Sequence, residues 1–277
     1  MINIGSEKSR DMDNTQETLN KGSSETTRTT YDNIFLEWLI GFTEGDDSFI
    51  INKNGSLEFK ITQSSKDAAI LFYIKKTLGF GSVSIQSKVS KTHHFRVRNK
   101  EGLAKIINIF NGFLQLNKSK QKFYNFLLNY NIYYKTELQF ITNNIDLISL
   151  NSAWICGFTD AEGCFTVSIL EHKISQVQVK FILSQQYEKE ILDKIAILFK
   201  GRVLYLANYY NEYNMTVQLI YLKTVLIYFN KYRLKTLKYI SYLKWKKIYN
   251  VIISKRHLET KDILEKIKLW AKKINCH

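Results

Sequence analysis

Apolar and polar residues alternate in several short segments of this chain, and stretches with helical spacing separate those segments. The alternation is clear in residues 165–169 and 177–181, and it returns in 82–88 and 93–98. Strict alternation is typical of antiparallel strands that bury one face and expose the other. The dipeptide Asn54-Gly55 adds a turn signal inside the first strand region. The pattern therefore predicts hairpins connected by helices.

The same order of elements is predicted twice along the chain. Each half has a helix, a strand pair (48–63; 164–185), a helix (66–78; 187–199), a second strand pair (82–88 with 93–98; 202–208 with 213–219) and two further helices. This αββαββα order predicts an α+β fold with antiparallel sheets. The predicted parts are a flexible leader at 1–33, an N-terminal half at 34–135, a linker at 136–150, a C-terminal half at 151–255 and a basic C-terminal helix at 256–277.

A repeated sequence supports the division into two halves. The segment WLIGFTEGDDSF, from Trp38, returns as WICGFTDAEGCF, from Trp154. The similarity extends to further segments, which pair 59–63 with 181–185 and 120–124 with 238–242. A unit that occurs twice at similar spacing indicates two equivalent structural units.

The repeated segment carries small residues and acids at fixed positions. Gly41 and Gly45 are four apart, as are Gly157 and Ala161, so each pair lies on one helix face and permits close helix packing. If the two motif helices pack along these faces, one acid from each copy projects from adjacent helix ends. These acids are Asp46 and Glu162.

Two adjacent carboxylates repel each other unless a cation lies between them. Oxygen ligands favour a hard ion, so we expect Mg²⁺ bound by Asp46 and Glu162. Such an ion can activate a water molecule and stabilise the leaving oxygen of a phosphodiester. The alternative is that these acids only cap or terminate helices.

The charge of the chain indicates a polyanionic partner. Lys and Arg number 40 against 25 Asp and Glu, a formal net charge of +15. The basic residues concentrate after Lys231, where apolar residues recur at helical spacing: Leu243, Ile248, Ile252, Leu264, Ile267 and Trp270. A run of charge is often only a solvated helix face, but the overall charge favours nucleic acid.

The polar faces of the predicted strands are candidates for DNA contact. They hold basic and hydrogen-bonding side chains suited to phosphates and base edges, and a β-ribbon fits the major groove. An ordinary half-exposed sheet would show the same alternation. The candidate DNA-binding residues are Lys60, Ser82, Ser84, Gln86, Lys88, His94, Arg96, Arg98, Thr166, Ser168, Gln178, Lys180, Arg202 and Gln218.

Several protein classes do not fit the sequence. The three cysteines form no CxxC pair and the five histidines have no zinc-ligand spacing, which argues against a disulfide scaffold or a zinc module. No run approaches the ~18 uncharged apolar residues of a membrane helix. The first thirty-odd residues match neither a signal peptide nor an organellar transit peptide. Absent proline and abundant Asn, Ile, Lys and Tyr indicate an AT-rich gene, so we expect a mitochondrially encoded protein.

The segments 39–47 and 155–163 resemble the two motifs of single-chain LAGLIDADG homing endonucleases, and the likeness extends from about 34 to 255. It is greatest to those encoded by mitochondrial group I introns. The resemblance implies a monomer with two pseudo-twofold-related halves whose sheets form a saddle over double-stranded DNA. It also implies metal ions between Asp46, Glu162 and the scissile phosphates, and double-strand cleavage with short 3′ overhangs at an intron-insertion site. The residues that it places near the edge of the active site are Gln63, Gln185, Lys120 and Lys238.

One motif residue departs from the family pattern. The ninth position is glycine at Gly163 but aspartate at Asp47. A side chain there would crowd the DNA or require a backbone conformation that glycine adopts most easily. A second function therefore stays open, in which the protein is an RNA maturase that assists splicing of its own group I intron while DNA cleavage is weak or lost.

Overall fold

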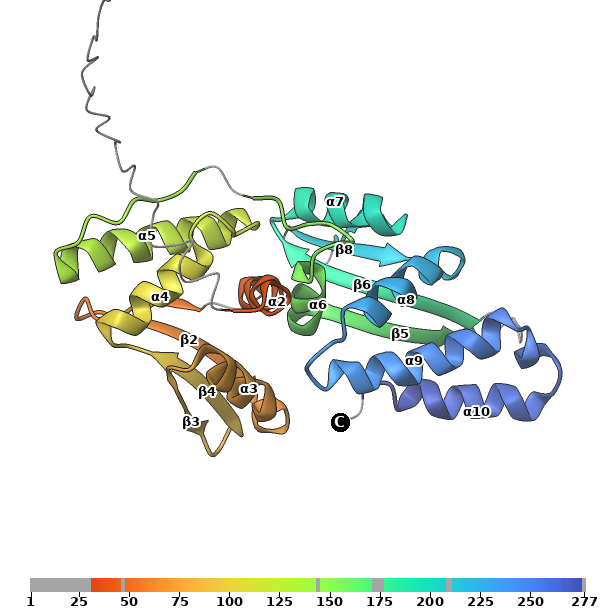
Figure 1. The fold of residues 1–277 in the computed structure, drawn as a ribbon. Coiled ribbons are helices and arrows are strands. Elements are labelled where there is room, and N and C mark those ends of the chain that lie inside the picture. Colours follow the sequence, from red (N-terminus) through yellow and green to blue (C-terminus); the bar gives the residue numbers. More distant parts are fainter. Residues whose placement is uncertain (1–30, 46–47, 143–144, 171–176, 208–210, 276–277) are drawn as a thin grey trace, which may run out of the picture.

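The predicted α+β fold with two repeated halves is confirmed (Figure 1). The structure is a computed structural model that describes residues 31–45, 48–142, 145–170, 177–207 and 211–275. Asp46, Asp47 and nearly all of the predicted leader lie outside the described residues. In the described part of the chain, no helix has the length and apolar character needed to cross a membrane.

Each half contains the same series of elements. The first half consists of α2 (Asn33–Glu44), β1 (Phe49–Ile51), β2 (Leu57–Ser64), η1 (Ser65–Asp67), α3 (Ala68–Leu78), β3 (Ser82–Ser87), β4 (Thr92–Val97), α4 (Lys100–Phe110) and α5 (Asn117–Tyr134). The second half consists of α6 (Trp154–Glu162), β5 (Gly163–Ile169), β6 (Val177–Gln186), α7 (Lys189–Phe199), β7 (Arg202–Tyr205), β8 (Glu212–Val217), η2 (Leu219–Tyr221), α8 (Leu222–Lys231) and α9 (Lys238–Ile253). The last elements are η3 (Arg256–Leu258) and α10 (Lys261–Lys272).

Each half forms one four-stranded antiparallel sheet. The strand orders are β1-β2-β4-β3 and β5-β6-β8-β7, so the two sheets have the same topology. The first hairpin turns where the sequence predicted it, because Gly55 has a φ of 78° and its amide donates to the carbonyl oxygen of Asn52 at 2.9 Å. Glycine reaches this left-handed conformation without steric cost.

Strand β3 differs from the predicted alternation. A bulge follows Ile85, so that Ser87, and not Gln86, lies opposite Thr92. A bulge adds one residue to one strand and moves the following side chains to the other face. Lys88 lies in the turn after β3. The strict alternation predicted across 82–88 therefore holds only as far as Ile85.

Helices α9 and α10 form in the basic segment as predicted, but the buried face of α9 differs. Leu243 is 44% exposed, whereas Tyr242 and Trp245 are buried against the second sheet. In α10, Leu264 and Ile267 are buried as the spacing predicted. The large aromatic residues, and not the leucine, decide which face of α9 packs, because they bury the most apolar area.

Equivalent aromatic clusters fill the two cores. In the first half, Phe49 packs against Phe59, Phe110, Phe123 and Phe126, with ring centroids 5.1–5.5 Å apart. In the second half, Phe165 packs against Phe181, Phe229, Tyr242 and Trp245 at 5.3–5.7 Å. Each half thus has its own aromatic cluster within one hydrophobic core, and the clusters show which residues are structurally equivalent.

Helices α2 and α6 join the two halves at the centre of the molecule (Figure 1). A Cβ atom at Gly41 would collide with the carbonyl oxygen of Trp154, and one at Gly157 would collide with that of Trp38. The close helix packing predicted from the small residues is therefore confirmed. This packing brings the last residues of both helices together.

Candidate active site

The sixth residue of each motif copy is a buried acid that joins the two halves. In the first copy this residue is Glu44, whose Oε1 accepts hydrogen bonds from the backbone amides of Gln115 and Leu116 at 2.7 Å each. Its Oε2 accepts a bond from Trp154 Nε1 at 2.7 Å. Burial raises the pKa of Glu44 to about 8, although these three bonds favour the charged form. Glu44 thus connects α2 to the start of α5 and to α6 of the other half.

Asp160 has the equivalent role in the second copy. Its carboxylate accepts bonds from the backbone amides of Lys235 and Thr236, from the Thr236 hydroxyl, and from Trp38 Nε1 at 2.8 Å. Burial raises the pKa of Asp160 as well. Each half therefore sends a tryptophan to the acid of the other. Neither acid was among the predicted site residues, although both motif copies have one at this position.

The eighth motif residue of the second copy lies at the junction of the halves. Glu162 is the last residue of α6 and is half-buried. Gly45 at the end of α2 lies next to it, since a Cβ added there would be 3.3 Å from Glu162 Oε1. The two helix ends are therefore side by side, as predicted. Asp46, the other predicted metal ligand, follows Gly45 and lies outside the described residues.

Gln185 and Lys118 lie close to Glu162. The Gln185 side chain hydrogen-bonds to the Glu162 carboxylate, and its Oε1 accepts a bond from Lys118 Nζ at 2.9 Å. Burial raises the pKa of Glu162, while the charges of Lys118 and Lys238 lower it. The predicted site residue Gln185 is thus at the junction. Lys118 extends from α5 of the first half to this site in the second.

Lys238 lies at the same junction. Its Nζ donates to the carbonyl oxygens of Ala161 at 2.6 Å and Thr159 at 3.2 Å, at the end of α6. Burial lowers the pKa of Lys238, although the charges of Asp160 and Glu162 raise it. This lysine therefore holds the helix end that carries Glu162.

A lysine of α5 that was not predicted, Lys118, lies beside Glu162, whereas the charge of the predicted Lys120 acts on Glu44. The repeat paired Lys120 with Lys238, but the aromatic clusters make Phe123 equivalent to Tyr242, so Ser119 occupies the position of Lys238. Lys118, one residue earlier, supplies the cation next to Glu162. The spacing of the buried aromatic residues was the signal that could have identified it. The predicted Gln63 lies near the end of β2, opposite His93.

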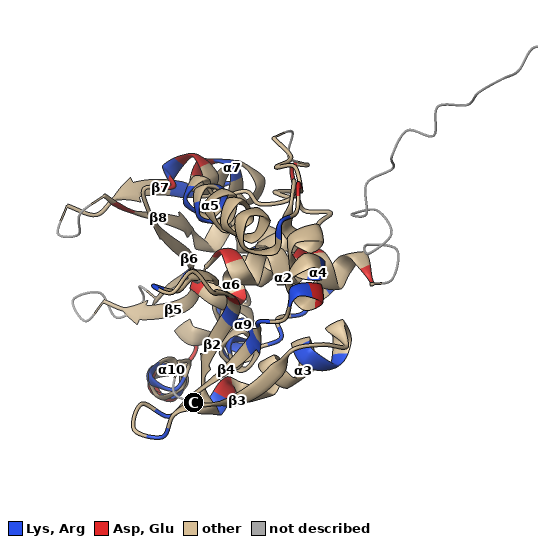
Figure 2. Cartoon of the chain, turned by 90° about the vertical axis from the view of Figure 1, so that its left-hand side faces the viewer, with Lys and Arg blue, Asp and Glu red and all other residues tan. Residues whose placement is uncertain are grey.

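The residues at the junction fit a magnesium ion. Mg²⁺ keeps several waters and binds through one or two carboxylates together with phosphate oxygens. Glu162 offers one carboxylate beside the residue that precedes Asp46, and its pKa is raised by burial, which a cation would offset. No cluster of three or more His, Cys, Asp or Glu side chains occurs among the described residues. Figure 2 shows the acidic segment of α6 near basic segments of the neighbouring elements.

The ninth motif residue Gly163 is restricted by space and not by backbone conformation. Its φ is −76° and its ψ is 152°, which any residue adopts. A Cβ atom there would collide with the Thr159 methyl group and lie 2.8 Å from the Thr159 carbonyl oxygen. The glycine therefore permits a close contact between β5 and α6. The counterpart Asp47 lies outside the described residues.

One face of the first sheet carries five of the predicted DNA-binding residues. Lys60 and Ser82 both lie opposite Arg96, and Ser84 lies opposite His94, so these five share a face. His94 is only 5% exposed, and its Nε2 is 2.9 Å from Ser84 Oγ. Burial and the Arg96 charge lower its pKa. His94 is therefore buried in this face and hydrogen-bonds to Ser84 on the neighbouring strand.

The corresponding face of the second sheet contains the predicted DNA-binding residues of the second half. The paired residues across its strands are Thr166 with Lys180, Ser168 with Gln178, and Arg202 with Thr216. Gln218 follows the end of β8 and is exposed. It lines a hollow of about 290 Å³ together with Gln178 and Lys180. The two sheets thus present polar and basic residues in equivalent positions.

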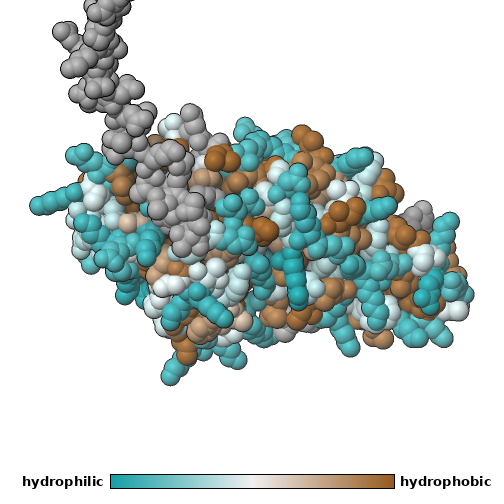
Figure 3. All heavy atoms as spheres, viewed as in Figure 1, coloured by the Kyte–Doolittle hydropathy of each residue, from teal (hydrophilic) through white to brown (hydrophobic). Residues whose placement is uncertain are grey.

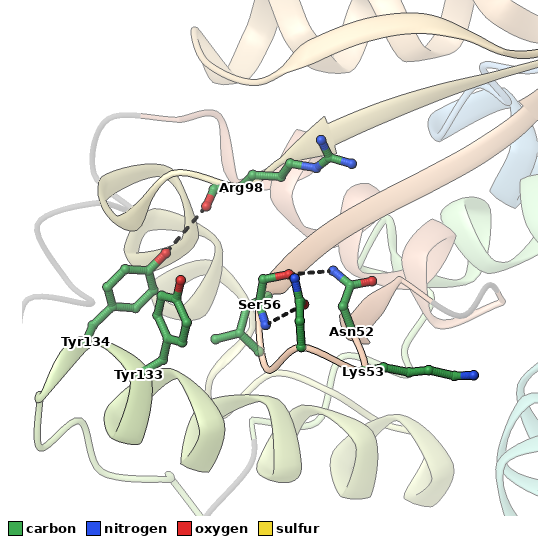
Figure 4. A pocket seen from close by; sticks show the side chains of 8 residues that line it. Asn52, Lys53, Ser56, Arg98, Tyr133 and Tyr134 are labelled. Carbon is green, nitrogen blue, oxygen red and sulfur yellow. Dashed lines mark hydrogen bonds between the residues drawn. The ribbon is translucent and has the colours of Figure 1, made fainter.

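A second hollow lies beside the hairpin of the first sheet (Figure 4). It has a volume of about 590 Å³, and Lys53, Tyr133 and Tyr134 are among the residues that line it. The Tyr134 hydroxyl donates to the carbonyl oxygen of Arg98 at 3.5 Å. Figure 4 shows the Arg98 side chain extending away from both tyrosines. Tyr134 thus contacts the backbone of Arg98, while the guanidinium group of Arg98 points away from the tyrosines and hydrogen-bonds to Glu58.

A family comparison matches both halves of the chain. The profile of the LAGLIDADG endonuclease family matches residues 39–133 and 155–249. The chain is 46% identical over 233 residues to "Probable intron-encoded endonuclease 4" of Neurospora crassa. The aligned segment covers 83% of this chain and 42% of that protein. It is 31% identical over 163 residues to "Intron-encoded RNA maturase bI4" of Saccharomyces cerevisiae, covering 57% of the chain and 24% of the maturase.

The fold is also similar to solved structures. The meganuclease I-SmaMI, bound to uncleavable DNA, superposes with a TM-score of 0.75 at 18% identity. The match covers 89% of this chain and all of that protein. I-SmaMI has also been solved on uncleaved target DNA in the presence of calcium ions.

Proposed function

Since the chain belongs to the LAGLIDADG endonuclease family, we propose that it is a site-specific endonuclease that hydrolyses both strands of DNA at an intron-insertion site and leaves short 3′ overhangs. The observation that carries the proposal is the position of Glu162. Its carboxylate lies where the ends of α2 and α6 meet, between cations from both halves. A site between two equivalent sheets can act on two strands of one duplex.

The chemistry follows from the groups at this junction. A magnesium ion held by Glu162 and Asp46 would supply a Lewis acid for the scissile phosphate and lower the pKa of an attacking water molecule. Lys118 and Lys238 provide positive charge where negative charge develops on the phosphate in the transition state. Gln185 holds the Glu162 carboxylate and is itself held by Lys118.

The two sheet faces are the proposed saddle that holds the DNA. Their lysines and arginines neutralise phosphates, and their amides and hydroxyls reach base edges in the major groove. One chain supplies both sheets and both motif helices, so we propose that the protein acts as a monomer. The composition and the intron-encoded relatives support a mitochondrial location.

A cleavage assay tests this function and its metal. The purified chain is incubated with a library of joined exon sequences from AT-rich mitochondrial genes, with Mg²⁺, Ca²⁺ or EDTA. We expect a double-strand cut at one junction with Mg²⁺ and none with EDTA. Sequencing the cut ends identifies the target and the overhang. Equal cutting in EDTA would refute the metal-dependent mechanism, and absence of any cut would refute the endonuclease function.

Lys118 and Lys120 provide a matched test of the active-site lysine. Lys118→Met should slow cleavage by roughly 10²-fold because it removes the cation beside Glu162 and the donor to Gln185. Lys120→Met removes the same charge two residues away and should have a much smaller effect. Single-turnover rates at saturating protein compare the two. If Lys120→Met were the slower variant, the assignment from the repeat would be right and ours wrong.

A second function has support from the C-terminal helices. Exposed basic residues cover the outer surfaces of α9, η3 and α10: Lys247, Lys255, Arg256, Lys266, Lys272 and Lys273. Hydrophilic side chains also lie over both halves in Figure 3, with apolar ones scattered among them. Basic surfaces of this kind contact RNA through shape and phosphates. The alternative proposal is therefore an RNA maturase that binds its own group I intron through these helices.

A further inference from the structure

A buried acid occupies the first DNA-facing sheet among the arginines. Glu58 in β2 is 2% exposed, although its neighbours on this face are basic. Its Oε1 accepts a bond from Arg96 Nε at 2.8 Å, and its Oε2 accepts bonds from Arg96 Nη2 at 2.8 Å and Arg98 Nε at 2.7 Å. One carboxylate thus holds two guanidinium groups.

The carboxylate is ionised in this arrangement. Burial alone would raise the pKa of Glu58, but the hydrogen bonds and charges of Arg96 and Arg98 outweigh it and the pKa is lowered. An ionised acid on a surface that faces phosphates weakens their attraction. The Glu58 carboxylate therefore does not serve to bind the DNA backbone, and we look for its function in its contacts with Arg96 and Arg98.

The geometry leaves one edge of each guanidinium group available. The bonds to Glu58 use Nε and Nη2 of Arg96 and only Nε of Arg98. Among the described residues, Glu58 is the sole acceptor that bonds either guanidinium. The outer Nη edges therefore remain available. Two Nη donors of such an edge can contact the O6 and N7 acceptors of one guanine.

Both arginines face an open space. They line a hollow of about 480 Å³ together with Ser82 and Ser84. The Arg98 side chain is 59% exposed and that of Arg96 is 27% exposed, whereas that of Glu58 is 3% exposed. The acid thus lies beneath and the guanidinium groups lie above it, where a duplex can reach them.

This arrangement occurs in the first half alone. The aromatic clusters make Phe59 equivalent to Phe181, so Lys180 is the counterpart of Glu58. The matching registers, with Phe59 opposite Val97 and Phe181 opposite Val217, make Thr216 the counterpart of Arg96. The second half therefore has no acid at the position of Glu58 and no arginine at the position of Arg96.

We propose that Glu58 is a specificity-determining residue, which fixes the guanidinium groups of Arg96 and Arg98 so that they read guanines in one half of the DNA target. The inference rests on the proposed function as a site-specific DNA-binding enzyme. A fixed guanidinium loses little conformational entropy on contact with a base and rejects bases that lack the two acceptors. Glu58 acts through the arginines and does not itself contact DNA.

The test is a binding selection on a randomised duplex library with the full chain, in Ca²⁺ to limit cleavage. The wild-type motif should contain guanine at one or two positions of a single half-site. Glu58→Gln should keep the rest of the motif but lose guanine preference there, by roughly 5- to 100-fold. Its affinity for non-specific DNA should rise, because a negative charge is removed. A merely structural defect would weaken all binding together.

Two further variants make the result decisive. Arg98→Lys keeps the charge at an exposed side chain but removes the planar fork, so it should lose guanine preference at one of the same positions. Glu190→Gln removes an exposed acid on α7, far from this face, and should leave the motif unchanged. Thermal unfolding checks that each variant is folded.

The possible results separate the inference from the proposed function. If Glu58→Gln and Arg98→Lys retain every guanine preference of the wild type, the role of Glu58 is refuted and the endonuclease proposal stands. If the wild-type protein selects no motif at all, both are refuted. Loss of the same guanine position in both variants supports the inference.

Discussion

Glu162→Gln is expected to lower the single-turnover rate of DNA cleavage by at least about 10²-fold, which is the scale of losing one group that stabilises charge in a transition state. The amide has the same shape but no charge, so it is a poor ligand for Mg²⁺. DNA affinity should change little, because the sheet faces that contact the DNA are unaffected. Binding is measured with Ca²⁺ and cleavage with Mg²⁺ on the same target.

The same variant separates the two proposed functions. If the protein also assists splicing through α9 and α10, Glu162→Gln should retain that activity in a splicing assay with the intron RNA. Glu190→Gln serves as the charge-matched control and should cut at the wild-type rate. Cleavage by Glu162→Gln at the wild-type rate would show that the metal and its chemistry lie elsewhere.

Gly157→Ala should destabilise the protein by about 3 kcal/mol, although the same change in an exposed helix stabilises by about 1 kcal/mol. The added methyl group would collide with the carbonyl oxygen of Trp38. That atom belongs to the backbone of α2 and cannot rotate away, so the two helices must separate. Urea unfolding followed by tryptophan fluorescence and by circular dichroism measures the change.

A control in the same protein gives the ordinary effect of such a change. Ala69 is exposed in α3, so Ala69→Gly should cost only the usual helix propensity, about 1 kcal/mol. If Gly157→Ala were neutral or stabilising, the close approach of α2 and α6 would not exist in solution.

The architecture was predictable because it depends on patterns that repeat. Alternation identified the strands, and the duplicated motif with Gly41 and Gly157 identified the packed helices. The exact register was not predictable, since the bulge after Ile85 depends on how β3 pairs with β4. Bulges leave no periodic signal in the sequence because a single inserted residue looks like a change of phase.

The candidate site was predictable where symmetry holds and not where it fails. Glu162 comes from the motif and Gln185 from the family resemblance, and their side chains hydrogen-bond to each other. Lys118 was missed because its counterpart in the other half is not a lysine at the matching position. Glu58 was missed because a single acid has no sequence signature, and only the fold brings its carboxylate within hydrogen-bond distance of Arg96 and Arg98.

The exchanged tryptophans have a consequence for recombining halves. The Trp38 indole donates a hydrogen bond to Asp160, and the Trp154 indole donates one to Glu44. Each half alone would therefore keep a buried carboxylate without its indole donor. A chimera that joins this N-terminal half to the C-terminal half of a relative must therefore preserve both hydrogen bonds between tryptophan and acid. The incoming half must bring both a tryptophan and an acid at these positions, whatever DNA sequence its sheet recognises. Target preference can thus be exchanged as a module only between proteins that share this reciprocal pair.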